Sequence, residues 1–384
     1  MQNKNEVLVI SAEASSNLYA QRLLELSASE EAPIHYWGVG NQDMIDLGFE
    51  ALGRAEDMAV MGFQEVLKHY PFIKGIYNNI LEQVDKRQTK VALLMDYAEF
   101  NMKLAGELKK RGVKVLFYIA PQIWAWRQGR VKKLKASIED LLCIFPFEEK
   151  FYQEHGVPTN FVGHPLLDEI EDKFFDLQER NIYRMQLGLT ENQRVLALMP
   201  GSRKSEISLN FRTQLDTAKL LKKQDPSVAV VVLAAPGMNL DLLKEYVRSD
   251  DPEFLFIQDR PFRMLSVCDF ALVSSGTATL VTGLMKKPMV VMYKMKPVSA
   301  WLAKKLVSKN NPYFAMVNLI FGKELMPEFF QEKANPKDLA KSISASWFDS
   351  SVYQNTLEEL EKLPALLGKK GATKRVLDVL REKL

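Results

Sequence analysis

The chain has 384 residues, of which 47% are hydrophobic and 26% are charged, and its formal net charge is +3. This length exceeds what one hydrophobic core usually organises, so we expect two globular domains. The charge is too small to indicate nucleic-acid binding, and no apolar run of about 18 residues predicts a membrane-spanning helix. The N-terminus lacks a signal-peptide pattern, and two widely spaced cysteines, Cys143 and Cys268, fit a reducing cytoplasm.

Short apolar runs alternate with helical patterns along the first half of the chain. Helices are expected over 17–28 and 99–112, and the second ends on Gly112 after a Lys-Lys-Arg turn. Strands are expected over 6–10, 34–39, 91–95, 114–119, 140–145 and 159–163. Continuous apolar strands separated by helices are typical of a parallel sheet covered on both faces.

The pattern begins again after a polar stretch at 168–193. A helix is expected over 211–224, and strands are expected over 194–199, 227–235, 254–258, 270–275 and 288–293. We therefore predict an α/β protein with three parts. These are an N-terminal Rossmann-like domain over 1–165, a C-terminal one over 166–345, and a helical segment over 346–384 that packs back on an N-terminal domain.

The loop after the strand at 194–199 is a candidate anion site, because ligands bind at the carboxyl ends of parallel strands. Gly201 permits a tight turn, Ser202 and the loop amides can donate hydrogen bonds, and a helix start follows. Arg203 adds donors suited to phosphate. An ordinary strand–helix connection with an exposed arginine is the alternative.

A second loop, 274–279, follows the strand at 270–275 and is rich in hydroxyl groups. It contains Ser275, Gly276, Thr277 and Thr279 at a helix start, which suits a diphosphate, although simple N-capping explains it as well. Two such loops in one domain favour the diphosphate interpretation.

In the first domain, Asp96 directly follows a buried strand, and Glu99 comes three residues later. A carboxylate at the carboxyl end of a strand can act as a general base on a substrate hydroxyl. Helix capping is the alternative for Asp96 and, more strongly, for Glu99.

Two further stretches carry candidate cleft residues. Trp124, Trp126 and Arg127 combine indoles with cations, as sugar and nucleotide sites do, although one indole in the core and a solvated basic helix also fit. His164 lies at a strand end beside the expected domain junction, where a structural role is the alternative. The sequence has no metal-ligand motif and no Asp-x-Asp pair, so we predict no metal and no cofactor.

The segment 58–81 mixes Met, Phe, Leu, Ile and Tyr with three basic or histidine side chains. Such a segment can rest on an anionic membrane or admit an acyl chain, and burial in the core is the alternative.

Several longer motifs occur together in one order along the chain. They are AVMGFQEVL, YIAPQIWAWRQGRV, FVGHPL, MPGSRKSEI, SSGTATL, PMVVMYKMKP with WLAKKLV, and VNLIFGKELMPEFFQ. With these motifs the chain resembles the lipid-A-disaccharide synthases over nearly its whole length.

The resemblance implies a GT-B fold, with two Rossmann-like domains facing across a cleft and C-terminal helices. It also implies an inverting, metal-independent transfer from UDP-2,3-diacylglucosamine to 2,3-diacylglucosamine 1-phosphate (lipid X), which gives the β-1,6 lipid A disaccharide 1-phosphate and UDP. A cytoplasmic enzyme peripheral to the inner membrane is implied, as is a homodimer that exchanges C-terminal parts.

The resemblance also assigns roles to individual residues. It implies that Asp96 is the base for the acceptor hydroxyl and that Arg203 faces the nucleotide diphosphate. The UDP-binding helix start would comprise Ser275, Gly276, Thr277 and Thr279. Asn318 matches an asparagine that usually follows a proline, where this chain has Val317.

This sequence departs from the family pattern at its first loop and at two other places. The loop Gly-Glu-Ala-Ser-Gly-Asp is replaced by residues 12–17, Ala-Glu-Ala-Ser-Ser-Asn, so that Glu13 and Ser15 match and Asn17 has lost a charge. Ala98-Glu99 replaces Pro-Asp, and Val281 replaces a glutamate. A catalytically weak or silent paralogue, which binds a UDP-sugar or lipid or pairs with a true synthase, is therefore the second hypothesis. A third is another UDP-sugar enzyme of this fold, such as an epimerase.

Overall fold

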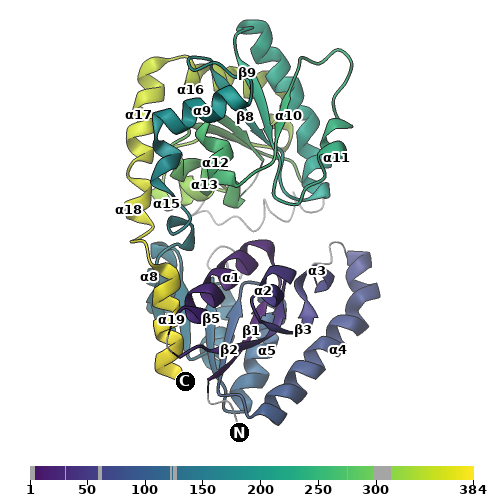
Figure 1. Ribbon diagram of the computed structural model, residues 1–384, viewed down its shortest axis with the longest axis vertical. Helices are drawn as coiled ribbons and strands as arrows, with labels where there is room; N and C mark the ends of the chain where they lie inside the picture. The colour runs from purple at the N-terminus through teal and green to yellow at the C-terminus, as the bar shows by residue number, and fades with distance from the viewer. Residues whose placement is uncertain are drawn as a thin grey trace. The chain divides into compact units, whose positions relative to one another are not determined.

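The computed structural model describes residues 5–30, 32–58, 63–121, 123, 128–274, 276–296 and 313–384. Within these ranges, the side chains of Ala14, residues 63–70 and Gln128 are not described. The chain forms two compact units. Unit 1 comprises Met1–Asp168 with Leu367–Leu384, and unit 2 comprises Glu169–Leu366 (Figure 1).

Unit 1 is built on a seven-stranded parallel sheet with the order β3-β2-β1-β4-β5-β6-β7. Its strands are β1 (Glu6–Ser11), β2 (His35–Gly40), β3 (Glu50–Arg54), β4 (Val91–Met95), β5 (Lys114–Tyr118), β6 (Asp140–Cys143) and β7 (Thr159–Phe161). In the register of the sheet, Ser11 pairs with Met95 and Met95 pairs with Tyr118. The loops after β1, β4 and β5 therefore emerge side by side.

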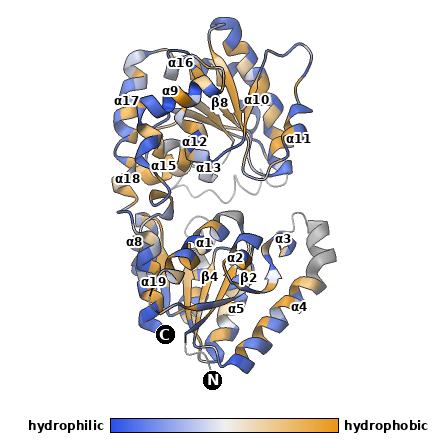
Figure 2. Cartoon of the chain, viewed as in Figure 1, coloured by the Kyte–Doolittle hydropathy of each residue, from blue (hydrophilic) through white to orange (hydrophobic). Residues whose placement is uncertain are grey.

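Helices cover this sheet because their apolar residues recur along one face. They are α1 (Ala14–Ala28), α2 (Gln42–Asp46), α3 (Ala55–Met58), α4 (Phe63–Arg87), α5 (Ala98–Lys110), α7 (Val131–Ser137), α8 (Pro146–Glu154) and α19 (Ala372–Lys383). The core combines fully buried β-strand residues with side chains of α4, α5 and α7. Figure 2 shows the same division, with apolar strands inside and two-faced helices outside.

Unit 2 has a six-stranded parallel sheet with the order β10-β9-β8-β11-β12-β13. Its strands are β8 (Val195–Met199), β9 (Ala229–Leu233), β10 (Leu255–Ile257), β11 (Phe270–Val273), β12 (Met289–Tyr293) and β13 (Glu328–Phe330). The helices around it are α9 (Leu177–Gln186), α10 (Lys204–Gln224), α11 (Leu240–Lys244), α12 (Pro261–Ser266), α13 (Gly276–Leu284), α15 (Met316–Phe321), α16 (Pro336–Trp347), α17 (Ser350–Leu360) and α18 (Leu363–Leu366). The predicted α/β class with parallel sheets is confirmed.

Each predicted strand is present, and two strands were not predicted. β3 is the edge of its sheet, only partly buried, and contains a glycine. β13 is an edge strand of three partly buried residues. β3 and β13 are half solvated and lack the continuous apolar run used to recognise the other strands, although the edge strands β7 and β10 were predicted. α10 also begins at Lys204, seven residues before the predicted start.

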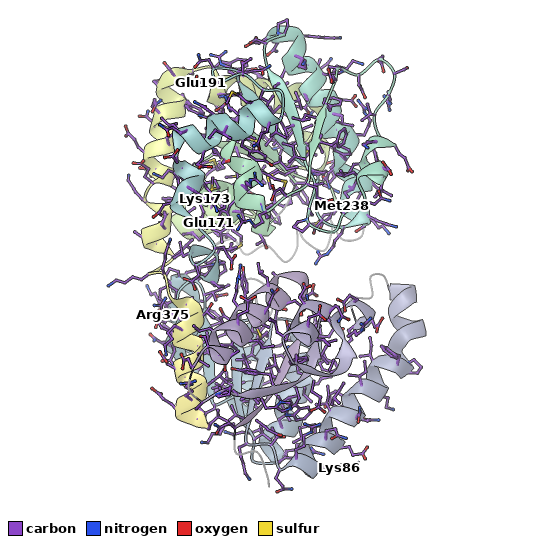
Figure 3. The ribbon with its side chains drawn as sticks, in the orientation of Figure 1. Lys86, Glu171, Lys173, Glu191, Met238 and Arg375 are labelled. Carbon is purple, nitrogen blue, oxygen red and sulfur yellow. The ribbon has the colours of Figure 1, made fainter. Side chains whose placement is uncertain are left out.

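The predicted C-terminal segment 346–384 is divided between the units. α17 packs on α16 and α18 packs on α13 and α15 in unit 2, whereas α19 packs on α1 in unit 1. Arg375 on α19 (Figure 3) donates from Nε to the Val162 carbonyl oxygen at 2.7 Å. The Asp168 carboxylate accepts from the Gly371 N–H at 2.5 Å. Of the segment 346–384, only residues 367–384 therefore belong to the N-terminal unit.

Cys143 and Cys268 are both buried and neither forms a disulfide. Among the residues that the structure describes, no helix is long and apolar enough to cross a membrane.

Candidate active site

The loop between β8 and α10 forms a tight turn closed by a carboxylate. Gly201 has a φ of +111°, and a Cβ there would lie 2.7 Å from Glu206 Oε2, so any other residue would be strained and would crowd Glu206. The backbone N–H of Ser202 donates to Glu206 Oε2 at 3.2 Å. Arg203 Nη1 donates to Glu206 Oε1 at 3.3 Å, and its side chain is 48% exposed. The turn thus places an arginine and an amide at the carboxyl end of β8, both bonded to Glu206.

Two buried amide side chains of α10 hold this turn in place. Asn210 Nδ2 donates to the Glu206 carbonyl oxygen at 2.8 Å, and its Oδ1 accepts from the Lys294 N–H, just beyond β12, at 3.0 Å. Gln214 Nε2 donates to Met199 at the end of β8 (3.1 Å), to Leu272 of β11 (3.2 Å) and to Ser274 Oγ (2.7 Å). Sequence reasoning missed both side chains, and their only signal is a polar residue on the apolar face of an amphipathic helix.

The second loop of unit 2 places its candidate residues differently. Ser275 lies outside the described residues, Gly276 begins α13 and Thr277 is exposed. Thr279 is fully buried, and its Oγ1 donates to the Gly276 carbonyl oxygen at 2.6 Å and accepts from the Met316 N–H at 3.1 Å. We therefore assign Thr279 to the packing of α13 on α15 instead of to a ligand contact.

Asn318 lies on α15 and is fully buried. Its Nδ2 donates to the Met326 carbonyl oxygen and to Glu328 Oε1, each at 2.7 Å. Its Oδ1 accepts from the N–H groups of Leu325 and Met326 at 2.9 and 2.8 Å. The amide is saturated by internal partners, so the expectation of a cleft contact is corrected to a structural role.

In unit 1, Asp96 and Tyr97 follow β4 in the left-handed conformation, with φ values of 49° and 43°. Ile119, beyond the neighbouring strand β5, also has a positive φ of 63°. Such residues cost about 1–2 kcal/mol each and cluster at functional sites. The Asp96 N–H donates to the Tyr118 carbonyl oxygen at 3.2 Å. The backbone around the predicted base is therefore strained and tied to the next strand.

A buried asparagine, missed by sequence reasoning, supports this strained turn. Asn101 of α5 is fully buried, and its Nδ2 donates to the carbonyl oxygens of Met95 and Asp96 at 3.1 and 2.8 Å. Glu99 forms an ion pair with Arg130 at 2.5 Å, and both side chains are exposed. Glu99 therefore has a cationic partner, Arg130, which follows the tryptophan motif in the sequence. Trp124, Trp126 and Arg127 themselves lie outside the described residues.

The loop after β1 is fixed by a serine that stands where the resemblance expects a glycine. Ser16 is fully buried, and its Oγ accepts from Ser11 Oγ at 2.9 Å and donates to the Glu13 carbonyl oxygen at 2.9 Å. Ser15 and Glu13 are half-buried at the start of α1. Asn17 is 7% exposed, and its buried Oδ1 has no hydrogen-bond partner within the described part of the chain.

His164 is buried at 2% exposure and packs edge-on against Tyr19 and tilted against Phe145. Its Nδ1 accepts from the Leu166 N–H at 3.1 Å. Burial lowers the pKa of His164 to about 3. The ring is neutral and internal, so we assign it to the fold of unit 1.

The apolar segment 58–81 is divided as well. Residues 59–62 lie outside the described residues. On α4, Ile76 and Ile80 belong to the core of unit 1, whereas Phe72 is 46% exposed. The described half of this segment therefore serves the core through one face.

The comparison with known families decides which enzyme class this arrangement belongs to. The sequence model of the lipid-A-disaccharide synthetases matches residues 7–375. The chain belongs to the lipid-A-disaccharide synthetase family. The synthase of Anaeromyxobacter dehalogenans strain 2CP-1 is 36% identical over 375 residues, 97% of this chain and 96% of that protein. That of Myxococcus xanthus is 32% identical over 384 residues, 100% of this chain and 99% of that protein.

Solved structures support the fold at much lower sequence identity. A UDP-GlcNAc 2-epimerase from Neisseria meningitidis, bound to UDP-GlcNAc, has a TM-score of 0.64 and 11% identity, and covers 98% of this chain and 100% of that chain. A glycosyltransferase from Rickettsia africae has a TM-score of 0.58 and 11% identity, with 98% of each chain covered. The predicted GT-B fold is confirmed. As a member of the lipid-A-disaccharide synthetase family, the chain is a glycosyltransferase of lipid A biosynthesis.

Proposed function

We propose that this synthetase joins UDP-2,3-diacylglucosamine to lipid X by direct displacement at the anomeric carbon. The acceptor's primary hydroxyl loses its proton to Asp96 as its oxygen attacks that carbon. The bond between the anomeric carbon and the UDP oxygen breaks, and UDP leaves with the electron pair. The family membership and the intact Asp96 and Arg203 support this reaction.

The role of Asp96 as general base rests on its position and on its backbone. It follows β4 at the carboxyl end of the sheet, where ligands of α/β folds bind. Its left-handed conformation is held by Asn101, as expected for a side chain whose direction matters. Positioned carboxylates acting as bases accelerate proton transfer by about 10²–10⁴-fold.

The role of Arg203 rests on the loop that carries it. Arg203 lies at the start of α10, with the Ser202 N–H beside it, so a guanidinium, an amide and a helix terminus act together on one anion. In the proposed reaction these groups, with Gly201, Gly276 and Thr277, bind UDP and stabilise the charge that develops on the leaving diphosphate.

The remaining partners are part of the same proposal. Both substrates carry acyl chains, which favours a peripheral position at the inner membrane on the cytoplasmic side. The exposed Phe72 within the segment 58–81 supports a contact there. The family resemblance also supports a homodimer with exchange of C-terminal parts.

One assay tests the reaction and the base together. Purified protein is incubated with lipid X and UDP-2,3-diacylglucosamine, and both the disaccharide and UDP are measured. Asp96→Asn should remove turnover while UDP binding persists, because the amide keeps the size but not the basicity of the carboxylate. The matched control is Asp85→Asn, which alters an exposed ion pair with Arg111 and should leave turnover unchanged.

Two results would contradict the proposal. Turnover retained in Asp96→Asn would reject Asp96 as the base. A folded wild-type protein that binds UDP but makes no disaccharide would support the silent paralogue instead. The replacements Asn17 and Val281 in the resemblance to the family motivate that second candidate.

A further inference from the structure

We infer that the Glu206 carboxylate occupies the diphosphate position of its loop before UDP binds. It thereby lowers the affinity of the loop for UDP. This inference rests on the proposed role of Arg203 in diphosphate binding. Glu206 takes no part in the chemical step. It holds the Ser202 N–H and the Arg203 guanidinium in position and releases them when the diphosphate binds.

The first step is the arrangement of donors around this carboxylate. One oxygen, Oε2, accepts from the Ser202 N–H at 3.2 Å, and the other, Oε1, accepts from Arg203 Nη1 at 3.3 Å. These are the amide and the guanidinium that a phosphate at this loop would use. Glu206 therefore presents two acceptor oxygens where a phosphate would present its own.

The second step is that the carboxylate can leave without disturbing the helix. The Glu206 backbone is fixed by the Asn210 side chain at 2.8 Å, and Asn210 is in turn bonded to Lys294. The Glu206 side chain is 24% exposed and faces Gly201, where no Cβ stands in its way. A rotation about its side-chain bonds therefore frees both donors while the start of α10 remains in place.

The third step is the competition between charges. A carboxylate and a diphosphate repel each other and compete for the same two donors, so UDP binds only as Glu206 gives up those contacts. The donors stay ordered in the meantime, which limits the reorganisation needed when the donor substrate arrives. Because the Glu206 carboxylate must first be displaced, every ligand that carries the diphosphate, UDP included, binds more weakly. UDP is also released faster.

A capping role is the competing explanation. Glu206 is the third residue of α10, where a glutamate commonly reaches back to the N-terminal backbone. If that were its whole function, Glu206→Gln would keep the cap and leave UDP binding unchanged, and Glu206→Ala would loosen the loop and weaken UDP binding. Only the inference drawn here predicts tighter UDP binding.

The experiment measures UDP and uridine binding by calorimetry on the full chain, for wild type, Glu206→Gln and Arg203→Met. Glu206→Gln should bind UDP about fivefold more tightly, because a nearby like charge is removed at a partly buried site. Uridine, which has no phosphate, should bind with unchanged affinity. In steady state, KM for the UDP-sugar and the inhibition constant of UDP should fall together, without a rise in kcat.

Glu179→Gln is the matched control, because Glu179 also lies in the first turn of a unit 2 helix but far along the chain from the loop. It should change neither affinity. Glu206→Ala serves as a second variant if the glutamine variant melts at a lower temperature, and it should also bind UDP more tightly than wild type.

The outcomes separate this inference from the proposed function. Weaker UDP binding in Arg203→Met together with tighter binding in Glu206→Gln supports both. Weaker binding in Arg203→Met with unchanged or weaker binding in both Glu206 variants overturns the inference and leaves the proposed function standing. UDP affinity unchanged in Arg203→Met overturns the assignment of Arg203 and the inference with it.

Discussion

The side-chain amide of Asn101 donates to the backbone carbonyl oxygen of Asp96 at 2.8 Å, although Asp96 adopts a left-handed conformation. The same amide donates to the carbonyl oxygen of Met95, the last residue of β4. One buried side chain therefore fixes both the end of the strand and the turn that carries the proposed base.

We expect Asn101→Asp to lower kcat by about 10- to 100-fold, because the carboxylate has the same shape but no N–H to donate. The KM for the UDP-sugar should change little, since Asn101 and the nucleotide loop lie in different units. Steady-state kinetics with varied donor and acceptor checks this. A folded Asn101→Asp protein with wild-type kcat would show that Asp96 needs no such support.

We expect Gly201→Ala to weaken UDP binding and to destabilise unit 2 by about 1–2 kcal/mol, because the new Cβ would be crowded by Glu206 at a φ that disfavours side chains. Gly237→Ala is the control, since its φ is +75° but its surroundings are open. It carries the backbone strain without the crowding. Equal UDP affinity in the two variants would contradict a ligand-binding role for the turn at Gly201.

We expect Gln214→Leu to cost about 2–3 kcal/mol of unfolding free energy, because Met199, Leu272 and Ser274 all lose their contact with one buried side-chain amide. UDP affinity should fall as well, since the side-chain link between the ends of β8 and β11 is removed. Thr217→Val, on the same helix, removes one internal bond and should cost about 1 kcal/mol without affecting UDP. Denaturant unfolding and calorimetry test both statements, which fail if the two variants behave alike.

His164 predicts a dependence of stability on pH. Burial lowers its pKa to about 3, so below a pKa of about 6.5 the unfolded chain binds a proton that the folded chain does not. Stability is therefore fully present above that value and falls as the pH drops towards 3. Between about pH 7.5 and pH 5 the loss should be about 2 kcal/mol. In His164→Asn, whose amide oxygen can accept the Leu166 N–H, this part of the pH dependence should vanish, and a persistent slope would reject the assignment.

Sequence patterns predicted the two sheets well, because central parallel strands are apolar throughout. They also placed Asp96 and Arg203 at strand ends, since the order of elements determines which loops share an edge. They could not separate ligand-facing polar residues from internal ones. Thr279, Asn318 and His164 have binding chemistry but face internal donors and acceptors.

The opposite error concerns Asn101, Glu206 and Gln214, which sequence reasoning left unassigned. Each acts on backbone groups contributed by a preceding strand or loop, and Gln214 bonds to Leu272, 58 residues away in the sequence. The spacing of residue types along the sequence does not predict such contacts. A polar residue in a helix is equally common on a solvated face.

Residues 367–384 complete unit 1 although the whole of unit 2 precedes them in the chain. During synthesis, unit 2 can therefore fold while unit 1 still lacks α19 and the contacts of Arg375 and Gly371. Until that helix has been made, the face of α1 that it covers lacks its partner. Unit 1 is thus completed only after both of its chain segments, which lie on either side of unit 2 in the sequence, have been synthesised.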